Sequence, residues 1–212
     1  MKQDCLISFF IIACLALTPF SSLCAQDMGK PFIVQVRTDK GTVPMAFHTR
    51  IEYGCFVGYQ EYNKPCIPIE TKGEIFIPDS VVTPDGQTLP VRWISRGSFQ
   101  GCQNITKVHL SHAIEYISDY AFQNCKSLRE ITLSDSLKNI YPQAFIGCDA
   151  LQRVTLRSPN PPRTYTEGTF EEKLLNTTTI VFPSNLEKKN WEYSDFTHFR
   201  YHADLIPIYR GQ

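Results

Sequence analysis

The sequence predicts a mainly β repeat solenoid, a chain that coils so that equivalent segments stack on one another. An apolar pattern recurs at one fixed interval, the same from Phe99 to Phe122 as from Phe122 to Phe145. Each copy contains a short run of alternating apolar and polar residues, which is the pattern of a strand with one buried face. Proline outnumbers glycine, 14 to 11, in a chain that is 42% apolar. This composition suits strands and turns better than long helices.

Residues 1–25 have the pattern of a secretory signal peptide. The apolar stretch that follows Lys2, residues 5–17, is shorter than the roughly 20 residues of a membrane-spanning helix. We expect cleavage after Ala25, which predicts an exported protein without a transmembrane segment in the mature chain. Two alternatives stay open. Cys24 could carry a lipid anchor, which the large Leu23 before it disfavours, or the segment could be an ordinary part of the core.

Residues 26–72 are predicted to form an N-terminal β cap. The segments 32–38 and 46–59 read as strands with turns at Lys40–Gly41 and Asn63–Pro65. A solenoid needs such a cap because its terminal apolar layer would otherwise meet water. A small β module fused to the repeats is the alternative interpretation.

Repeats are predicted over residues 73–158. The clear copies are 94–116, 117–139 and 140–162, and the last loses the pattern after residue 156. A degenerate earlier copy covers 73–81, and a turn is inserted before residue 94. One copy cannot fold alone, because ordering its backbone costs more than its few buried side chains return. Six positions agree in type across the copies: Ile94, Ile117 and Ile140; Phe99, Phe122 and Phe145; Cys102, Cys125 and Cys148; Ile105, Leu128 and Leu151; Val108, Ile131 and Val154; Leu110, Leu133 and Leu156.

The copy AFQNCKSLREITLSDSLKNI at 121–140 resembles the BspA-like leucine-rich repeat of exported bacterial proteins. The resemblance implies a right-handed coil with a curved parallel sheet of about five rungs. It also implies a binding or adhesive role at the cell surface and no catalytic residues. Gly101, Asn124 and Gly147 follow the Phe positions, and these residue types tolerate a left-handed backbone.

Two structural ladders follow from stacking, because equivalent residues in adjacent rungs lie about 4.7–4.9 Å apart. The three thiols then form a row that is too long for one zinc ion, whose sulfur ligands lie about 2.3 Å from the metal. We expect buried free thiols, with a disulfide between neighbouring rungs as the alternative. The ladder residues are Phe99, Phe122 and Phe145 with Cys102, Cys125 and Cys148.

Cys55 and Cys66 lie outside these ladders. They belong to two strand-like runs joined by a polar turn, so a hairpin disulfide between them is one interpretation and two separate thiols is the other.

The strand residues that point away from the core form a candidate binding face. The rows are Lys107, Glu130 and Arg153, and beside them His109, Thr132 and Thr155. Alternating charges on adjacent strands stabilise the register, so this face could be a purely structural ladder or a surface that contacts a partner. Exposed aromatic side chains beside it would favour binding, and small polar residues alone would favour a spacer.

No pattern in the chain points to catalysis, a cofactor or a metal. Neither a metal-binding histidine motif, a nucleophile elbow nor a phosphate loop occurs, and the formal net charge is zero, which gives no sign of a nucleic-acid surface. The sequence therefore favours a binding module for protein or glycan. The alternative is a structural spacer or a subunit of an envelope assembly. Cell surface, secreted and periplasmic locations all fit export.

Residues 159–212 are predicted to form a final rung and a mixed C-terminal cap. Pro159, Pro161 and Pro162 are expected to stop the ladder, and residues 177–183 to add one last strand. Ser184 and Glu187 form a capping box that predicts a short helix from Asn185.

Overall fold

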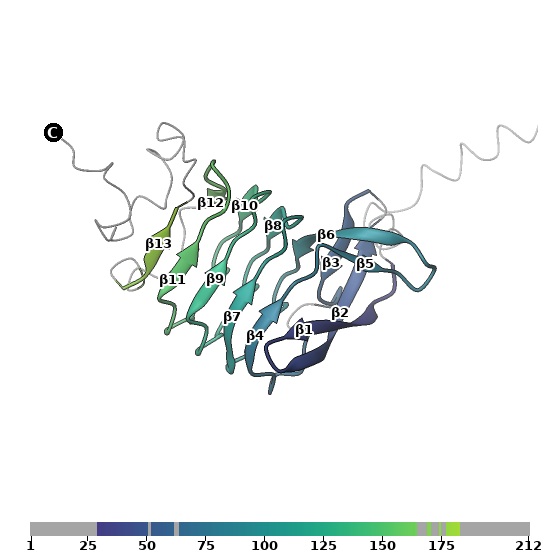
Figure 1. Cartoon of the computed structure of the whole chain (residues 1–212), viewed down its shortest axis with the longest axis horizontal. Coiled ribbons are helices and arrows are strands. Elements are labelled where there is room, and N and C mark those ends of the chain that lie inside the picture. Colours follow the sequence, from purple (N-terminus) through teal and green to yellow (C-terminus); the bar gives the residue numbers. More distant parts are fainter. Residues whose placement is uncertain are drawn as a thin grey trace, which may run out of the picture.

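The structure is a computed structural model that describes residues 29–50, 52–61, 64–164, 169–170, 174 and 177–182. Within them the chain is built from thirteen strands, β1 to β13. The predicted signal peptide, the Cys24 anchor position and the helix predicted from Asn185 lie outside the described residues. The predicted mainly β solenoid is confirmed (Figure 1).

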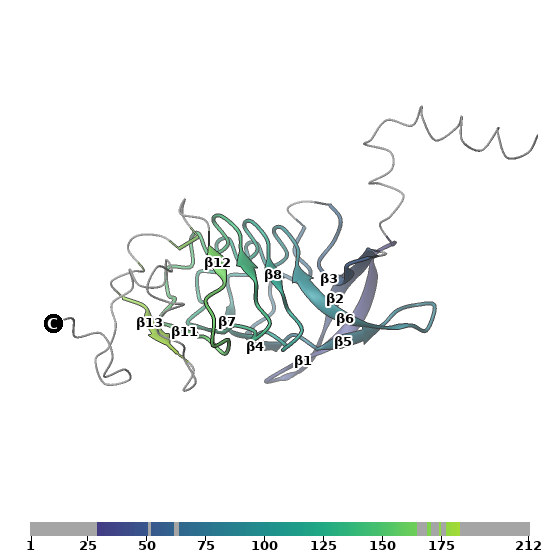
Figure 2. The same ribbon diagram turned by 90° about the horizontal axis from the view of Figure 1, so that it is seen from above.

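Two ladders of parallel strands run along the coil. The first ladder contains β4 (Gly73–Phe76), β7 (Ile105–His109), β9 (Glu130–Thr132), β11 (Arg153–Thr155) and β13 (Thr179–Val181), each paired with the next in parallel. The second ladder contains β6 (Thr88–Ile94), β8 (Tyr116–Ile117), β10 (Asn139–Ile140) and β12 (Arg163–Thr164). Seen from above, the two ladders form opposite walls of the coil (Figure 2).

Three antiparallel strands join the two ladders at the N-terminal end. They are β1 (Phe32–Thr38), β2 (Gly41–Arg50) and β3 (Gly54–Val57). β1 pairs with β4 of the first ladder, and β3 pairs with β6 of the second. The sheet order is therefore continuous from one ladder to the other, β12-β10-β8-β6-β3-β2-β1-β4-β7-β9-β11-β13.

The insertion before residue 94 forms a hairpin, in which β5 (Ser80–Val82) pairs antiparallel with β6. Its turn closes on Thr83, whose hydroxyl donates to Asp85 and accepts from the Gln87 N–H. The hairpin projects from the end of the solenoid in Figure 1.

The prolines after Leu156 do not end the second ladder, contrary to the expectation. β12 forms directly after Pro162, and its Arg163 N–H donates to Lys138 O at 2.7 Å. The prolines lie in the turn, where no ladder hydrogen bond requires their missing N–H. β13 falls within the segment expected to add a last strand.

Aromatic rings stack along the core between the ladders. Phe99, Phe122 and Phe145 follow one another at centroid distances of 5.0 and 5.2 Å, and Phe170 extends the row by a further 5.0 Å. The first three are fully buried. Stacked, nearly parallel rings fix the vertical register of successive copies.

The thiols form a parallel row beside the rings. Cys125 donates to the Phe99 carbonyl and Cys148 to the Phe122 carbonyl, each at 3.1 Å, so both thiols bond to the previous copy. Burial raises the pKa of Cys102 to about 12, with a smaller contribution from the charge of Glu70. Burial also raises the pKa of Cys125. The Cys102 and Cys125 thiols are therefore protonated, and a protonated thiol is a poor nucleophile.

Cys55 and Cys66 are both free and buried, so the disulfide considered between them is not formed. Cys55 lies on β3, but Cys66 lies in no strand. The Cys66 N–H donates to Ser98 O, just as the Phe99 N–H donates to Ala121 O one copy later. Cys66 therefore belongs to an irregular rung stacked on the first clear copy. Burial and then the neighbouring Cys102 raise its pKa.

Candidate functional site

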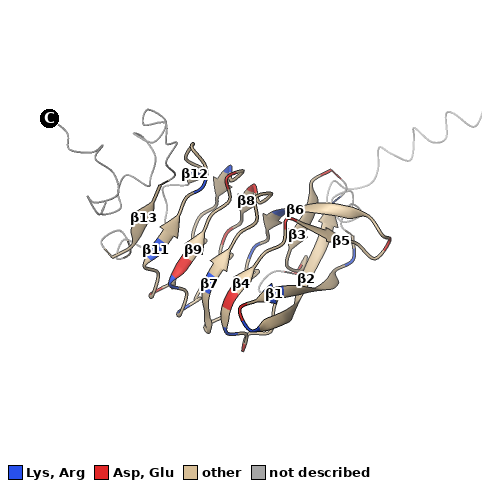
Figure 3. Ribbon diagram, in the orientation of Figure 1, with Lys and Arg blue, Asp and Glu red and all other residues tan. Residues whose placement is uncertain are grey.

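The candidate binding face is the outer surface of the first ladder, and its predicted charge row is one residue longer than expected. Strand pairing places Glu74, Lys107, Glu130 and Arg153 side by side, so the charge alternates from strand to strand. Figure 3 shows this alternation along β4, β7, β9 and β11. Lys107 Nζ lies 3.0 Å from Glu130 Oε2. Partly exposed pairs of this kind contribute about 0.2–1 kcal/mol each, enough to favour one register.

The second row of the face begins with an aromatic residue. Pairing aligns Phe76, His109, Thr132 and Thr155. The His109 ring stacks on Phe76 at 4.3 Å, and the Arg37 guanidinium lies 4.2 Å from the centre of the same ring. His109 Nε2 lies 2.9 Å from Glu74 Oε2, so its partner is Glu74 and neither Glu130 nor a thiol. The face thus combines an aromatic group at one end with small polar threonines further along.

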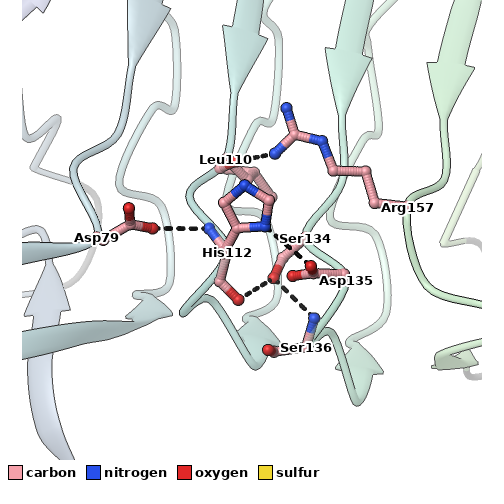
Figure 4. Close-up of polar contacts among 7 residues, drawn as sticks. All are labelled: Asp79, Leu110, His112, Ser134, Asp135, Ser136 and Arg157. Carbon is pink, nitrogen blue, oxygen red and sulfur yellow. Dashed lines mark hydrogen bonds and ion pairs between the residues drawn. The ribbon is translucent and has the colours of Figure 1, made fainter.

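One edge of the first ladder carries a polar cluster around His112 (Figure 4). The His112 N–H donates to Asp79 Oδ1, and its ring Nδ1 lies 2.8 Å from Asp135 Oδ2. The Ser134 hydroxyl donates to the His112 carbonyl and accepts from the Ser136 N–H. The hydroxyl oxygen meets backbone groups and not the imidazole, so the cluster lacks the nucleophile-to-base contact of a hydrolase. It fastens successive turns to one another.

The second ladder carries an aromatic row that the sequence interpretation missed, with His48 and Phe56 buried and Trp93 and Tyr116 partly exposed. The rings of His48, Phe56, Trp93 and Tyr116 stack in sequence at 5.0, 5.2 and 3.9 Å. A signal was present, because Trp93 and Tyr116 occupy the same repeat position, each directly before an aligned isoleucine. The row was hidden because its first two rings come from β2 and β3, which have no repeat spacing.

A second charge row lies beside these rings. Glu115 is flanked by Arg92, whose Nη1 lies 3.7 Å away, and by Lys138, whose Nζ lies 2.7 Å away. The hydrogen bond to Glu115 raises the pKa of Lys138 above its usual value. Both outer faces of the coil therefore use alternating charge.

A groove of about 270 Å³ opens where β3, β6 and β8 end. Parallel strands bring their carboxyl ends to one edge of a sheet, so the residues after each strand converge there. His48 is one of its lining residues, and the ring Nδ1–H donates to Gly58 O at 3.0 Å. Burial lowers the pKa of His48, so the ring is neutral at pH 7. The groove is lined by His48, Arg50, Phe56, Tyr59, Gln60, Trp93, Ser95, Arg96, Ser118 and Asp119.

Within the described ranges, no three histidine, cysteine, aspartate or glutamate residues are grouped so that they could hold a metal ion. In the same part of the chain, no helix has the length and apolar character needed to cross a membrane.

The repeat, the parallel ladders and the stacked phenylalanines define a leucine-rich repeat solenoid. Residues 87–203, more than half of the chain, match the family described as BspA type Leucine rich repeat region (6 copies). The chain therefore belongs to the BspA-type leucine-rich repeat family.

A solved structure shows the same fold. It is a leucine-rich repeat protein from Bacteroides capillosus ATCC 29799, 23% identical with a TM-score of 0.52, over 72% of this chain and 99% of that one. The T. pallidum leucine-rich repeat protein is 18% identical with a TM-score of 0.48, over 73% of this chain and 66% of that one. A leucine-rich cell surface protein from Faecalibacterium prausnitzii A2-165 is 17% identical with a TM-score of 0.46, over 74% of this chain and 44% of that one. No curated protein matches.

Proposed function

We propose that the protein is an exported, non-catalytic binding module that recognises a protein or a glycan at the bacterial cell surface. The binding surface in this proposal is the outer face of the first ladder, with Lys107, His109, Glu130, Thr132, Arg153 and Thr155. Family membership supports the surface role, and the signal-peptide pattern of residues 1–25 supports export.

One observation carries the binding interpretation. Phe76, stacked with His109 and Arg37, adds an aromatic group to a face that otherwise presents alternating charges and threonines. Aromatic and arginine side chains dominate binding energy at protein interfaces, and this face carries Arg153 as well as Phe76. The face is small, so the interface would belong to the weaker, transient class.

The test immobilises the mature chain, residues 26–212, and measures retention of glycans on an array and of proteins from envelope extracts. The comparison protein is a triple variant in which Lys107, Glu130 and Arg153 are each replaced by threonine, which keeps strand propensity and removes the charge row. We expect at least about tenfold weaker retention by this triple variant. Equal retention by both proteins, or none by either, would contradict the proposal.

A structural spacer is the second candidate, and a specific observation favours it. Lys107 pairs with Glu130, and His109 pairs with Glu74, so much of the polar surface is satisfied internally. If the protein is a spacer, the immobilised chain retains no ligand, and the envelope assembly nevertheless fails to form without the protein.

A further inference from the structure

The groove at the ends of β3, β6 and β8 is a rigidly built feature separate from the face proposed above. The Ser95 N–H donates to Val57 O at 3.0 Å, and the Ser118 N–H donates to Ile94 O at 2.9 Å, so each loop is fastened to the strand before it. At Gly58 the backbone has φ +113°, and a Cβ there would overlap the Ser98 hydroxyl. The loops that carry the lining residues are therefore held in place by the fit at Gly58 and by ladder hydrogen bonds.

The aromatic lining presents ring edges. Trp93 is covered on one face by Phe56 at 5.2 Å and on the other by Tyr116 at 3.9 Å, and Phe56 is itself stacked between His48 and Trp93. The edges of such rings supply apolar C–H surface and leave no open face for a flat aromatic ligand to stack upon. An occupant of the groove must therefore be held mainly by hydrogen bonds and charge.

The polar lining has both signs of charge and several hydroxyls. Arg50 and Arg96 provide two guanidinium groups against the single carboxylate of Asp119, while His48 is neutral. Ser118 and Tyr59 add hydroxyl groups to this lining.

We propose that this groove is a second binding site, and that its ligand is a sugar residue carrying a carboxylate, of the uronic acid type. The arginines bind the carboxylate, since guanidinium and carboxylate form charge-assisted paired hydrogen bonds. Asp119 accepts from sugar hydroxyls, and Ser118 pairs with a further one. The ring edges of Phe56 and Trp93 contact the C–H groups of the pyranose.

Other ligand classes match the lining less well. A neutral sugar offers no anionic group to the guanidinium groups of the lining, and a peptide carboxylate offers no hydroxyl groups to Asp119 and Ser118. The volume of about 270 Å³ is close to the lower end of small-molecule pockets, about 300–1,000 Å³, which suits one or two sugar rings.

The test titrates the mature chain, residues 26–212, with D-glucuronate and with D-glucose as the neutral match, and follows saturation-transfer NMR and Trp fluorescence. Trp93 borders the groove and reports on it directly, and Trp191→Phe removes the other tryptophan of the chain. We expect a dissociation constant on the order of 1 mM for D-glucuronate, typical of a small polar ligand, and about tenfold weaker binding of D-glucose. Arg50→Gln should weaken D-glucuronate about tenfold and leave D-glucose unchanged.

Asp119→Asn should weaken both sugars, because a hydroxyl then loses its charged acceptor. The matched control is the threonine triple variant of Lys107, Glu130 and Arg153, which should bind D-glucuronate normally even if it loses its surface partner. Equal affinity for both sugars, no effect of Arg50→Gln in a protein with unchanged circular dichroism, or binding of a peptide carboxylate with neither sugar would each overturn the proposal. A failure here leaves the retention experiment on the first ladder unaffected, so the two proposals stand or fall separately.

Discussion

Gly101 and Gly147 occupy the same turn position in different copies, with φ of +73° and +74°. Asn124 holds this position in the copy between them with φ +58°, so the left-handed backbone expected at all three residues is confirmed. A Cβ at Gly101 would meet no atom within 4 Å, whereas one at Gly147 would overlap Asn124 Oδ1 and lie 3.2 Å from Asn124 Cα. The two glycines therefore separate backbone strain from crowding.

Gly101→Ala should lower the free energy of unfolding by about 1–2 kcal/mol for the left-handed backbone, less a fraction gained from a stiffer unfolded chain. Gly147→Ala should cost at least about 1 kcal/mol more, because the new methyl group also displaces Asn124. Urea unfolding of the two variants measures the difference. Equal losses would show that the loop yields to the methyl group without cost.

The buried thiols make stability depend on alkaline pH. Burial raises the pKa of Cys55 and of Cys102 to about 12 from a usual value of 9.0. Between those values the unfolded chain loses thiol protons that the folded chain keeps. The contribution of these thiols is thus complete below pH 9 and is lost as the pH rises toward 12.

We expect the free energy of unfolding to fall by about 1.4 kcal/mol per pH unit for each such thiol above pH 9. Cys102→Ala should reduce the slope of this decline by about 1.4 kcal/mol per pH unit. This reduction distinguishes the titration of the Cys102 thiol from that of lysine and tyrosine. Urea midpoints across this range test the slope. A variant whose pH dependence matches that of the wild-type protein would refute the assignment to Cys102.

At the scale of the strand, alternating charge is the recurring device. Glu130 of β9 lies between Lys107 of β7 and Arg153 of β11. Glu130→Gln should cost about 0.5 kcal/mol of stability, and Glu130→Lys about 1 kcal/mol, because repulsion replaces attraction on both sides. Urea unfolding at low ionic strength measures both.

Salt supplies the control for this prediction. In about 1 M NaCl the screening length falls to about 3 Å, so the two Glu130 variants should become nearly equal in stability. A gap between them that persists in salt would mean that the lysine side chain fails to pack, and that charge is not the cause.

The strands that repeat could be predicted, and those that do not repeat could not. The fixed interval between copies identifies β7, β9 and β11 because stacking requires like side chains at like positions. The rung that contains Cys66 has no such interval and no strand, so only its backbone hydrogen bond to Ser98 O reveals its place. Left-handed Tyr120 and Gln143 were also missed, since neither residue type favours that conformation.

The candidate face could be predicted in its centre and not at its end. Alternation along β7, β9 and β11 identified the outward residues. The contact of His109 with Glu74 and Phe76 depends on the pairing of β4 with β7. This pairing includes a register shift, which no pattern in the sequence predicts. The groove combines residues from β2, β3 and β6 and from three loop starts, so no local pattern points to it.

At the scale of the whole molecule, β2 holds the two ladders in one sheet. Phe47 is fully buried on β2 and is paired with Phe32 of β1 and Val57 of β3. Because β1 leads to the first ladder and β3 to the second, loss of packing at Phe47 acts on both.

Phe47→Ala should lower the free energy of unfolding by about 3–5 kcal/mol, as expected for a truncated core phenylalanine. In a Trp191→Phe background, Trp93 fluorescence, which reports mainly on the second ladder, and circular dichroism, which reports on all strands, should shift to the same urea midpoint. Val82→Ala, at an exposed position on β5, is the control and should change little. Midpoints that separate would show that the ladders unfold independently.

Because the charges alternate from strand to strand, removing or adding an odd number of repeat units has a different effect from removing or adding an even number. Removal of one unit, residues 94–116, would set Glu74 against Glu130 on one wall and Arg92 against Lys138 on the other. Duplication of two units, residues 94–139, would leave opposite signs adjacent on both walls, and their excision would set Glu74 against Arg153 on the first wall. A lineage of such proteins should therefore lengthen or shorten in even steps more readily than in odd ones, unless a charge reversal accompanies the change.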